Sequence, residues 1–185
     1  MKTWITSDLH FGHERIREFC PKTRGHYNST AHMNEDMIAQ WNANVSAGDR
    51  VYILGDVSFQ NPQVAAETVA RLNGHKVLVA GNHDRKNLKN ELFAAQFQEI
   101  HNYLELNYNG NYIVMMHYPI CEWDRMHRGS LHFHGHLHGN HSGLEKFRAR
   151  DAGFDATGNV VTLMENLIAS ALKGEIKGHH TGPIP

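Results

Sequence analysis

Five short segments of the sequence carry side chains that could bind metal ions or move protons. They are Asp8-Leu9-His10, Gly55-Asp56, Gly81-Asn82-His83-Asp84, Met116-His117-Tyr118-Pro119 and Gly135-His136-Leu137-His138-Gly139. Together they offer carboxylate oxygens, an amide oxygen and imidazole nitrogens, and they contain no thiol. This mixture of oxygen and nitrogen donors favours Mn, Fe, Zn, Co or Ni over the metals that prefer thiolates. The segments therefore indicate a site for divalent cations.

The spacing within the segments supports a shared centre. In an extended chain, residues i and i+2 point to the same side, so Asp8 and His10 can face one point, as can His136 and His138. Glycines stand before Asp56, Asn82 and His136 in the sequence. A glycine allows the chain to turn sharply after a strand and to approach a ligand closely.

Each of the five segments follows an apolar stretch that reads as a β-strand. Periodicity predicts strands over 2–7, 51–54, 76–80, 100–106, 112–117 and 131–134, helices over 30–46, 62–72, 87–97 and 160–172, and loops over 20–30 and 118–130. This order predicts an α/β fold, a two-sheet β-sandwich with mixed sheets flanked by helices. Ligands in such folds gather at the carboxyl ends of the strands, where these segments fall.

Length and composition fit one domain over residues 1–185, with 174–185 as a polar C-terminal tail. Hydrophobic residues make up 41% of the chain and charged residues 20%, and the net charge is −1. This balance gives no field that would attract nucleic acid, so a nucleic-acid substrate would have to be held locally. We expect no membrane partner, and the lack of a signal-like N-terminus together with the isolated Cys20 and Cys121 predicts a cytoplasmic protein.

Histidine is unusually frequent, with 16 residues in the chain. Histidine is the commonest metal ligand and the usual proton carrier near neutral pH. We expect His179 and His180, which lie in the polar tail, to have no role.

Taken in order, the five segments resemble the calcineurin-like metallophosphoesterase family, in the form of its small, compact members without a cap domain. The resemblance covers residue 5 to about residue 139 and implies an α/β/β/α arrangement. It implies one metal held by Asp8, His10, Asp56 and His138, and a second held by Asp56, Asn82, His117 and His136. Asp56 would bridge the two metals and share the catalytic role with His83.

The implied activity is hydrolysis of a phosphodiester or a cyclic nucleotide by a hydroxide that bridges the metals. Two dications roughly 3.5–4 Å apart polarise the phosphoryl oxygens and supply hydroxide at neutral pH. His83 is the candidate proton donor to the leaving oxygen. The chain departs from the family in one place, because Phe59 stands where many members carry the acid that orients this histidine. Asp84 or a loop residue is an alternative partner for His83, and hydrogen bonding to the phosphate is an alternative role for it.

Other readings of the same residues remain open. The alternatives are a phosphomonoesterase acting on a small phosphate ester, a scaffold of the same fold without catalysis, and a metal-storage protein. A small phosphate ester or nucleotide is the expected substrate, and Mn²⁺ is the metal expected to support activity in vitro. The sequence does not indicate an oligomeric state.

Four residues outside the ligand set are candidates for substrate binding. His13 could contact phosphate or begin a helix, and Arg85 could bind phosphate in a bidentate manner or lie on the surface. Trp123 could stack on a base, with Arg125 beside it on phosphate, or the pair could belong to an ordinary surface loop anchored by the tryptophan. The segment from Arg24 to Tyr27 offers a similar choice. For His132 and His134, a packed histidine is the alternative to a role beside the site.

Overall fold

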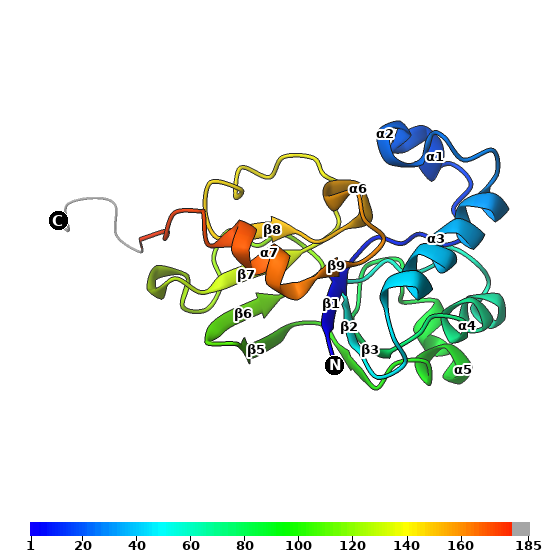
Figure 1. Cartoon of the computed structure of the whole chain (residues 1–185), viewed down its shortest axis with the longest axis horizontal. Helices are drawn as coiled ribbons and strands as arrows, with labels where there is room; N and C mark the ends of the chain where they lie inside the picture. The colour runs from blue at the N-terminus through cyan, green and yellow to red at the C-terminus, as the bar shows by residue number, and fades with distance from the viewer. Residues whose placement is uncertain (179–185) are drawn as a thin grey trace.

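The first β-sheet is built around three apolar strands that run parallel: β1 (Thr3–Thr6), β2 (Arg50–Ile53) and β3 (His75–Val79). β4 (Glu99–His101) pairs in parallel with β3, and β9 (Thr162–Leu163) pairs antiparallel with β1. The order across the sheet is therefore β4-β3-β2-β1-β9. Figure 1 shows the chain as a computed structural model, which describes residues 1–178.

The second sheet has four strands in the order β5-β6-β7-β8. β5 (Leu104–Tyr108) and β6 (Asn111–Met115) form an antiparallel hairpin around Asn109-Gly110. β7 (Leu131–His134) and β8 (Ala149–Asp151) continue the sheet in parallel with β6. Both sheets are mixed, and the expected α/β fold class with two sheets flanked by helices is confirmed.

The two sheets pack against each other through alternate residues of their strands. Ile5, Tyr52 and Val77 of the first sheet share one buried cluster with Ile113 and Phe133 of the second. Their sequence neighbours point to the opposite faces, since successive side chains of a strand alternate. This shared core holds the two sets of parallel strands side by side, and their carboxyl ends carry the polar segments.

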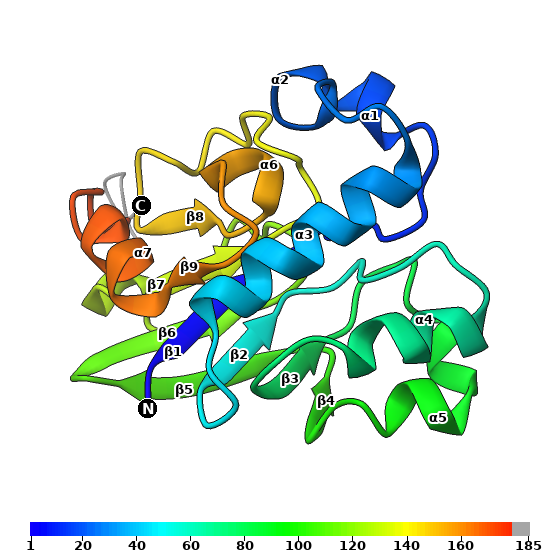
Figure 2. The ribbon, with the colours of Figure 1, turned by 45° about the vertical axis from the view of Figure 1, so that its right-hand side comes forward.

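Helices of unequal length connect the strands. They are α1 (Ile16–Phe19), α2 (Pro21–Arg24), α3 (Thr30–Asn44), α4 (Pro62–Ala70), η1 (Asn87–Lys89), α5 (Glu91–Ala94), η2 (Met126–Arg128), α6 (Phe154–Thr157) and α7 (Met164–Ala171). Residues of α3, α4 and α5 bury the outer face of the first sheet, and Figure 2 shows α3 lying across β1 and β2. The outer face of the second sheet is covered by the loop that contains Trp123 and Met126.

Several predicted boundaries differ from the structure. The strand expected over 100–106 is two strands, β4 and β5, and they lie in different sheets. The segment 20–30, expected as a loop, contains the short helix α2. The final helix begins at Met164, because Thr162 and Leu163 pair with β1 instead. β8 was missed because its sequence, Ala-Arg-Asp, has no apolar alternation to reveal a strand.

The described part of the expected C-terminal tail contacts the rest of the chain. The Glu175 backbone N–H donates to the carbonyl of Lys146, and Lys177 Nζ donates to the carbonyl of Cys121 at 2.8 Å. His179 and His180 lie outside the described residues. Within residues 1–178, no helix has the length and apolar character needed to cross a membrane.

Candidate metal centre

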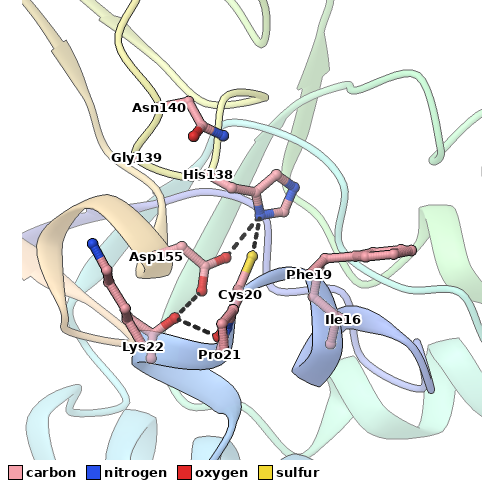
Figure 3. Close-up of a pocket in the computed structure, with 10 residues that line it drawn as sticks. Ile16, Phe19, Cys20, Pro21, Lys22, His138, Gly139, Asn140 and Asp155 are labelled. Atoms are coloured by element: carbon pink, nitrogen blue, oxygen red, sulfur yellow. Dashed lines mark hydrogen bonds and ion pairs between the residues drawn. The ribbon is translucent and has the colours of Figure 1, made fainter.

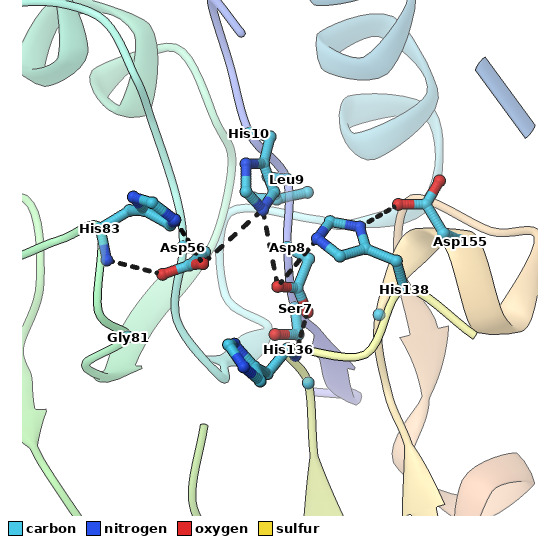
Figure 4. Close-up of polar contacts among 12 residues, drawn as sticks. Ser7, Asp8, Leu9, His10, Asp56, Gly81, His83, His136, His138 and Asp155 are labelled. Carbon is cyan, nitrogen blue, oxygen red and sulfur yellow. Dashed lines mark hydrogen bonds and ion pairs between the residues drawn. The ribbon is translucent and has the colours of Figure 1, made fainter. Parts of the chain in front are cut away.

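The structure brings the seven predicted metal ligands together at the carboxyl ends of five strands. Asp8 follows β1, Asp56 follows β2, Asn82 follows β3, and the three later histidines follow β6 and β7. Figure 4 shows the acidic side chains near the middle of this group, with His83 and His138 on opposite sides. The polar segments therefore meet where two sets of parallel strands end, as expected for ligand sites in this kind of fold.

Asp8, His10 and His138 form one group of ligand-type atoms, here called the Asp8 cluster. Asp8 Oδ1 lies 3.6 Å from His10 Nε2 and 3.8 Å from His138 Nε2. The second carboxylate oxygen, Oδ2, accepts the backbone N–H of His136 at 2.8 Å. One oxygen of Asp8 is thus held by the backbone while the other faces two imidazole nitrogens.

Asp56, His117 and His136 form a second group, here called the Asp56 cluster. His117 Nδ1 donates to the carbonyl of Leu54 at 2.7 Å, so its lone pair in the neutral ring is at Nε2. That nitrogen lies 3.0 Å from Asn82 Oδ1 and 3.5 Å from Asp56 Oδ2. Acceptor atoms that face one another in this way are the arrangement expected of ligands to a shared cation.

The carboxylate of Asp56 lies between the two clusters. Its Oδ2 is 3.7 Å from His10 Nε2 in one cluster and 3.5 Å from His117 Nε2 in the other. Its Oδ1 accepts the backbone N–H of His83 at 2.9 Å. The side chain is 3% exposed, so little water reaches it. A single carboxylate oxygen therefore faces both groups of imidazoles.

The backbone at the candidate ligands is strained. Five of the seven have positive φ angles, in the left-handed region that residues with a Cβ seldom adopt: Asp8 (56°), His10 (52°), Asp56 (54°), His136 (70°) and His138 (50°). Each such residue costs on the order of 1–3 kcal/mol, and conformations of this kind cluster at functional sites. The turns after the strands aim these side chains inward at the expense of local stability.

Two glycines allow the loops to approach each other. A Cβ on Gly81 would collide with the carboxylate of Asp56, and one on Gly135 would collide with Ser7 and with the carboxylate of Asp8. In both places the backbone passes directly over a carboxylate. The sequence pattern of a glycine before a ligand thus reflects close packing of one ligand loop on another.

His138 is oriented by a carboxylate that the sequence did not reveal. Its Nδ1 is 2.7 Å from Asp155 Oδ2, which leaves Nε2 facing Asp8. Burial lowers the pKa of His138, but hydrogen bonds to Asp155 and Cys20 and the charge of Asp8 outweigh it and raise the pKa to about 10. A carboxylate behind a histidine ligand fixes the ring and increases its basicity.

Asp155 is in turn held by a buried arginine. Arg24, which is 0% exposed, donates from Nε and Nη2 to the Asp155 carboxylate at 2.8 and 2.9 Å. Its other donors reach the carbonyls of Asp8 and Leu9. Burial alone would raise the pKa of Asp155, but the bonds from His138 and Arg24 hold it well below its usual range. Arg24 therefore holds the loop that carries Asp8 and His10 in place, and it does not act as a substrate contact.

His83 lies beside the clusters with its ring packed on an aromatic side chain. Its Nε2 is 3.9 Å from Asp56 Oδ2, and its ring centroid is 4.4 Å from that of Phe59. Asp84 does not take over the orienting role, because its carboxylate accepts the backbone N–H groups of Gly81, Asp56 and Val57. Asp84 instead ties two ligand loops together.

Two of the four predicted substrate contacts lie next to the clusters. The His13 ring packs edge-on against Phe59 with centroids 4.1 Å apart and lies 5.5 Å from the His10 ring. Arg85 is exposed and lines hollows beside Asn82 and His83. Both positions are compatible with contact to a substrate bound at the clusters.

The other two candidates for substrate binding, Trp123 and Arg125, pack on residues of the second sheet, which corrects the substrate-binding role considered for them. Trp123 is 6% exposed, stacks on His132 with centroids 5.3 Å apart and donates to the Ser130 carbonyl. The guanidinium of Arg125 lies over the Tyr112 ring, at the start of β6 and away from the ligand end of that strand. The loop is anchored by its tryptophan, the alternative that the sequence left open.

His132 and His134 are packed histidines. His132 accepts the backbone N–H of Ile120 and donates to the Val114 carbonyl, and burial lowers its pKa to about 3, so it stays neutral. His134 Nδ1 donates to the Gly135 carbonyl. Neither ring belongs to the two clusters of ligand atoms.

The residues present fit divalent cations. Asp8 Oδ1 and both ring nitrogens of His10 are buried and have no hydrogen-bond partner among the described residues. Buried polar atoms are almost always paired, so unpaired atoms that face other ligand-type atoms point to an ion. The donor set of carboxylate, imidazole and amide suits a borderline metal.

Comparison with known proteins agrees with this geometry. The model of the calcineurin-like phosphoesterase family matches residues 1–156. The chain belongs to this family. It is accordingly a metal-dependent phosphoric ester hydrolase, and its suggested relation to small, compact family members is confirmed.

Relatives of the chain include proteins from an archaeon and a phage. An uncharacterized protein of Methanocaldococcus jannaschii is 32% identical over 142 residues, which cover 76% of this chain and 71% of that protein. The Gene 66 protein of Mycobacterium phage L5 is 33% identical over 85 residues, which cover 44% of this chain and 39% of the phage protein.

A solved structure shares the fold. The crystal structure of a protein of unknown function from Aquifex aeolicus has a TM-score of 0.63 with this chain at 24% sequence identity. The match covers 83% of this chain and 90% of that chain.

Proposed function

We propose that this chain is a phosphodiesterase that uses two divalent cations, with Mn²⁺ as a metal that supports turnover. The Asp8 cluster together with Asp56 holds one cation, and the Asp56 cluster together with Asn82 holds the other. The observation that carries the proposal is the single oxygen, Asp56 Oδ2, that lies within 3.7 Å of His10 Nε2 and 3.5 Å of His117 Nε2.

The protein prepares this site before the reaction. When bound, a pair of divalent cations lowers the pKa of water and stabilises charge on the phosphoryl group. The chain keeps the ligand atoms in place, since the backbone holds one oxygen of Asp8 and of Asp56, and Leu54 and Asp155 hold the Nδ1 atoms of His117 and His138. Such preorganisation avoids rearrangement during the reaction.

His83 supplies the proton for the leaving oxygen in this proposal. It belongs to neither ligand cluster, and its side chain is 45% exposed, so its ring can reach a substrate. Phe59 packs on the ring but offers no hydrogen bond. The neighbouring His10 and Phe59 rings, at 5.9 and 4.4 Å, limit where the His83 ring can lie.

A His83→Ala variant tests this role. Turnover of a phosphodiester with a poor leaving group should fall by about 10²-fold or more, as expected when a general acid is lost. Two equivalents of Mn²⁺ should still bind, measured by mass spectrometry of the metal content. The matched control is His141→Ala, because His141 is a highly exposed histidine that belongs to neither cluster.

Leaving groups distinguish proton donation from phosphate binding. The loss in His83→Ala should shrink with a nitrophenyl diester, whose leaving group needs no proton. A loss of equal size for all leaving groups would assign His83 to phosphate binding, and a loss of metal would make it a ligand.

A substrate panel tests the reaction class. The Mn²⁺-loaded protein should hydrolyse bis-p-nitrophenyl phosphate and 2′,3′- or 3′,5′-cyclic nucleotides faster than p-nitrophenyl phosphate. A preference for the monoester would replace the phosphodiesterase with a phosphomonoesterase at the same centre.

A further inference from the structure

A pocket of about 450 Å³ opens directly beside the metal ligand His138. One wall comes from the short helices α1 and α2, and the other from the loop His138–Asn140. Figure 3 shows Phe19 near one end of this pocket and Lys22 near the other, with Cys20 and Asp155 between them. Its volume lies within the range of about 300–1,000 Å³ typical of sites for small organic groups.

The wall of this pocket is apolar only in part, because Lys22, Thr23, His138, Asn140 and Asp155 contribute polar side chains to it. Ile16, Phe19, Cys20 and Pro21 line it, and Phe19 is 57% exposed. The carboxylate of Asp155 is already bonded to Arg24 and His138 and therefore presents little free charge. The Arg15 guanidinium lies over the Phe19 ring, 4.8 Å from its centroid. An exposed aromatic ring at the edge of a partly apolar pocket is suited to stacking on a flat ring such as a nucleobase.

A second hollow, of about 380 Å³, lies beside His83. Arg85 and Lys86 contribute to its lining, together with Phe59 and Gln60. Among its described lining residues there are two cations and no acidic side chain. This hollow is therefore suited to an anionic or strongly polar group.

The two hollows lie on different sides of the candidate metal centre. The pocket beside Phe19 includes His138, and the hollow beside Arg85 and Lys86 includes His83. Figure 4 shows these two histidines on opposite sides of Asp8, His10 and Asp56. The His10 ring centroid is 4.8 Å from that of His138 and 5.9 Å from that of His83. A phosphorus atom at the clusters would thus have space for an organic group on each side.

We infer that the substrate is a phosphodiester with two unlike groups, a nucleoside in the pocket beside His138 and an anionic leaving group in the hollow beside His83. The inference rests on the proposed function and narrows its substrate class. A phosphomonoester would use only one of the two hollows. The leaving group falls on the side of His83, where that residue can donate a proton to its oxygen.

The nucleoside arm is tested with two nitrophenyl diesters, thymidine 5′-(p-nitrophenyl phosphate) and methyl p-nitrophenyl phosphate. They share the p-nitrophenol leaving group and differ in the group that stays on the phosphate, which is thymidine in one and methyl in the other. The wild-type protein should prefer the thymidine ester in kcat/KM. Phe19→Ala should lower that preference by about tenfold, the size expected for loss of one aromatic stack. Leu92→Ala, which truncates an exposed apolar residue on α5 that does not line the pocket, should keep the preference.

Binding gives a second readout that does not depend on turnover. Calorimetry should show that Phe19→Ala weakens binding of thymidine 5′-monophosphate relative to inorganic phosphate. If Phe19→Ala changed neither the ratio of kcat/KM values nor the ratio of the two affinities, the inference would be overturned while the diesterase proposal stood. Failure of the Mn²⁺-loaded wild-type protein to hydrolyse either diester would instead overturn the proposed function.

The anionic arm is tested with 4-carboxyphenyl and 4-acetylphenyl esters of thymidine 5′-monophosphate. The double variant Arg85→Ala with Lys86→Ala should lower the preference for the carboxyphenyl ester by about threefold, because exposed charge pairs contribute little. Lys89→Ala, a nearby exposed cation outside the hollow, is the control. An unchanged preference in the double variant would remove the anionic leaving group from the inference.

Discussion

The two ligand clusters differ in how the protein supports them. In the Asp8 cluster, His138 is backed by Asp155, which is itself bonded to the fully buried Arg24. In the Asp56 cluster, His117 is backed by the carbonyl of Leu54, and His136 is exposed. One cluster is supported by charged side chains, whereas the other depends on the backbone and has one exposed member, His136.

This difference predicts unequal metal binding. A carboxylate behind a ligating histidine increases the basicity of the ring, and burial excludes water that would compete for the cation. We therefore expect the Asp8 cluster to retain its cation more tightly than the Asp56 cluster. The Asp56 cluster is also the one beside Arg85 and His83, where the leaving group lies in our proposal.

The largest effect is expected from a substitution of the residue that the two clusters share. Asp56→Asn should lower hydrolysis of bis-p-nitrophenyl phosphate by at least about 10²-fold, because a neutral amide stabilises two cations poorly. Metal analysis should show weaker binding at both positions. Asp124→Asn, a substitution on an exposed loop, is the control. Unchanged turnover, or loss of only one metal, would show that Asp56 does not bridge.

A smaller effect is expected from a substitution of the carboxylate behind His138, and it should make the metal affinities of the two clusters more alike. Asp155→Asn should weaken the tighter metal by about 10- to 100-fold, the usual cost of losing a partner behind a ligand, and leave the weaker metal unchanged. The metal-free protein should also lose about 3 kcal/mol in its free energy of unfolding, because Arg24 stays buried without its counter-charge. Metal titration and denaturant unfolding measure the two effects.

The control for Asp155→Asn is a surface ion pair. Glu35→Gln breaks the bonds that Arg71 donates to the exposed Glu35 carboxylate, and it should leave both metals and the free energy of unfolding nearly unchanged. Equal weakening of both metals in Asp155→Asn would contradict the assignment of this carboxylate to one cluster.

The smallest effect concerns a carboxylate outside both clusters. Asp49 accepts the backbone N–H groups of Lys2 and Ser46 and the indole N–H of Trp4, and these bonds lower its pKa to about 2. A carboxyl group with a lowered pKa stabilises the fold above its unfolded value near 3.9, and this contribution is lost as pH falls through about 2.

Asp49→Asn should therefore unfold at a lower temperature than the wild type at pH 5, and the difference should disappear as pH falls toward 2. Thermal unfolding followed by circular dichroism measures it. Metal content at neutral pH should be unchanged, which separates fold stability from the clusters. A difference that persists at the lowest pH would mean that the charge of Asp49 is not its source.

The polar segments and their strands were predictable from the sequence because each strand is an apolar stretch and the residues directly after it have side chains that can bind metal. Asp8-x-His10 follows a strand, and Gly-His136-x-His138 follows another, so their place after strands indicated a shared centre. The extended chain assumed for these pairs was wrong, because all four residues have positive φ and His136 and His138 belong to different clusters. The parallel order of β1, β2 and β3 then follows from strands that alternate with helices.

Contacts between residues far apart in the sequence were not predictable. Arg24 and Asp155 are separated by 131 residues, and neither stands in a recognisable motif. Trp123 could stack on a base or anchor a surface loop, and only the fold showed that it packs on His132. β8 is short and polar, and it is a strand because its neighbour β7 supplies the hydrogen bonds.

The left-handed turns at the ligands imply a conflict between activity and stability. A glycine at His136 or His138 would relax the backbone, since glycine adopts positive φ without strain, but it would delete a ligand. Substitution at these positions would thus stabilise the metal-free protein but remove side chains that the metal centre needs. Selection for thermal resistance alone would erode this centre, so at these five candidate ligands function, and not folding, determines the sequence.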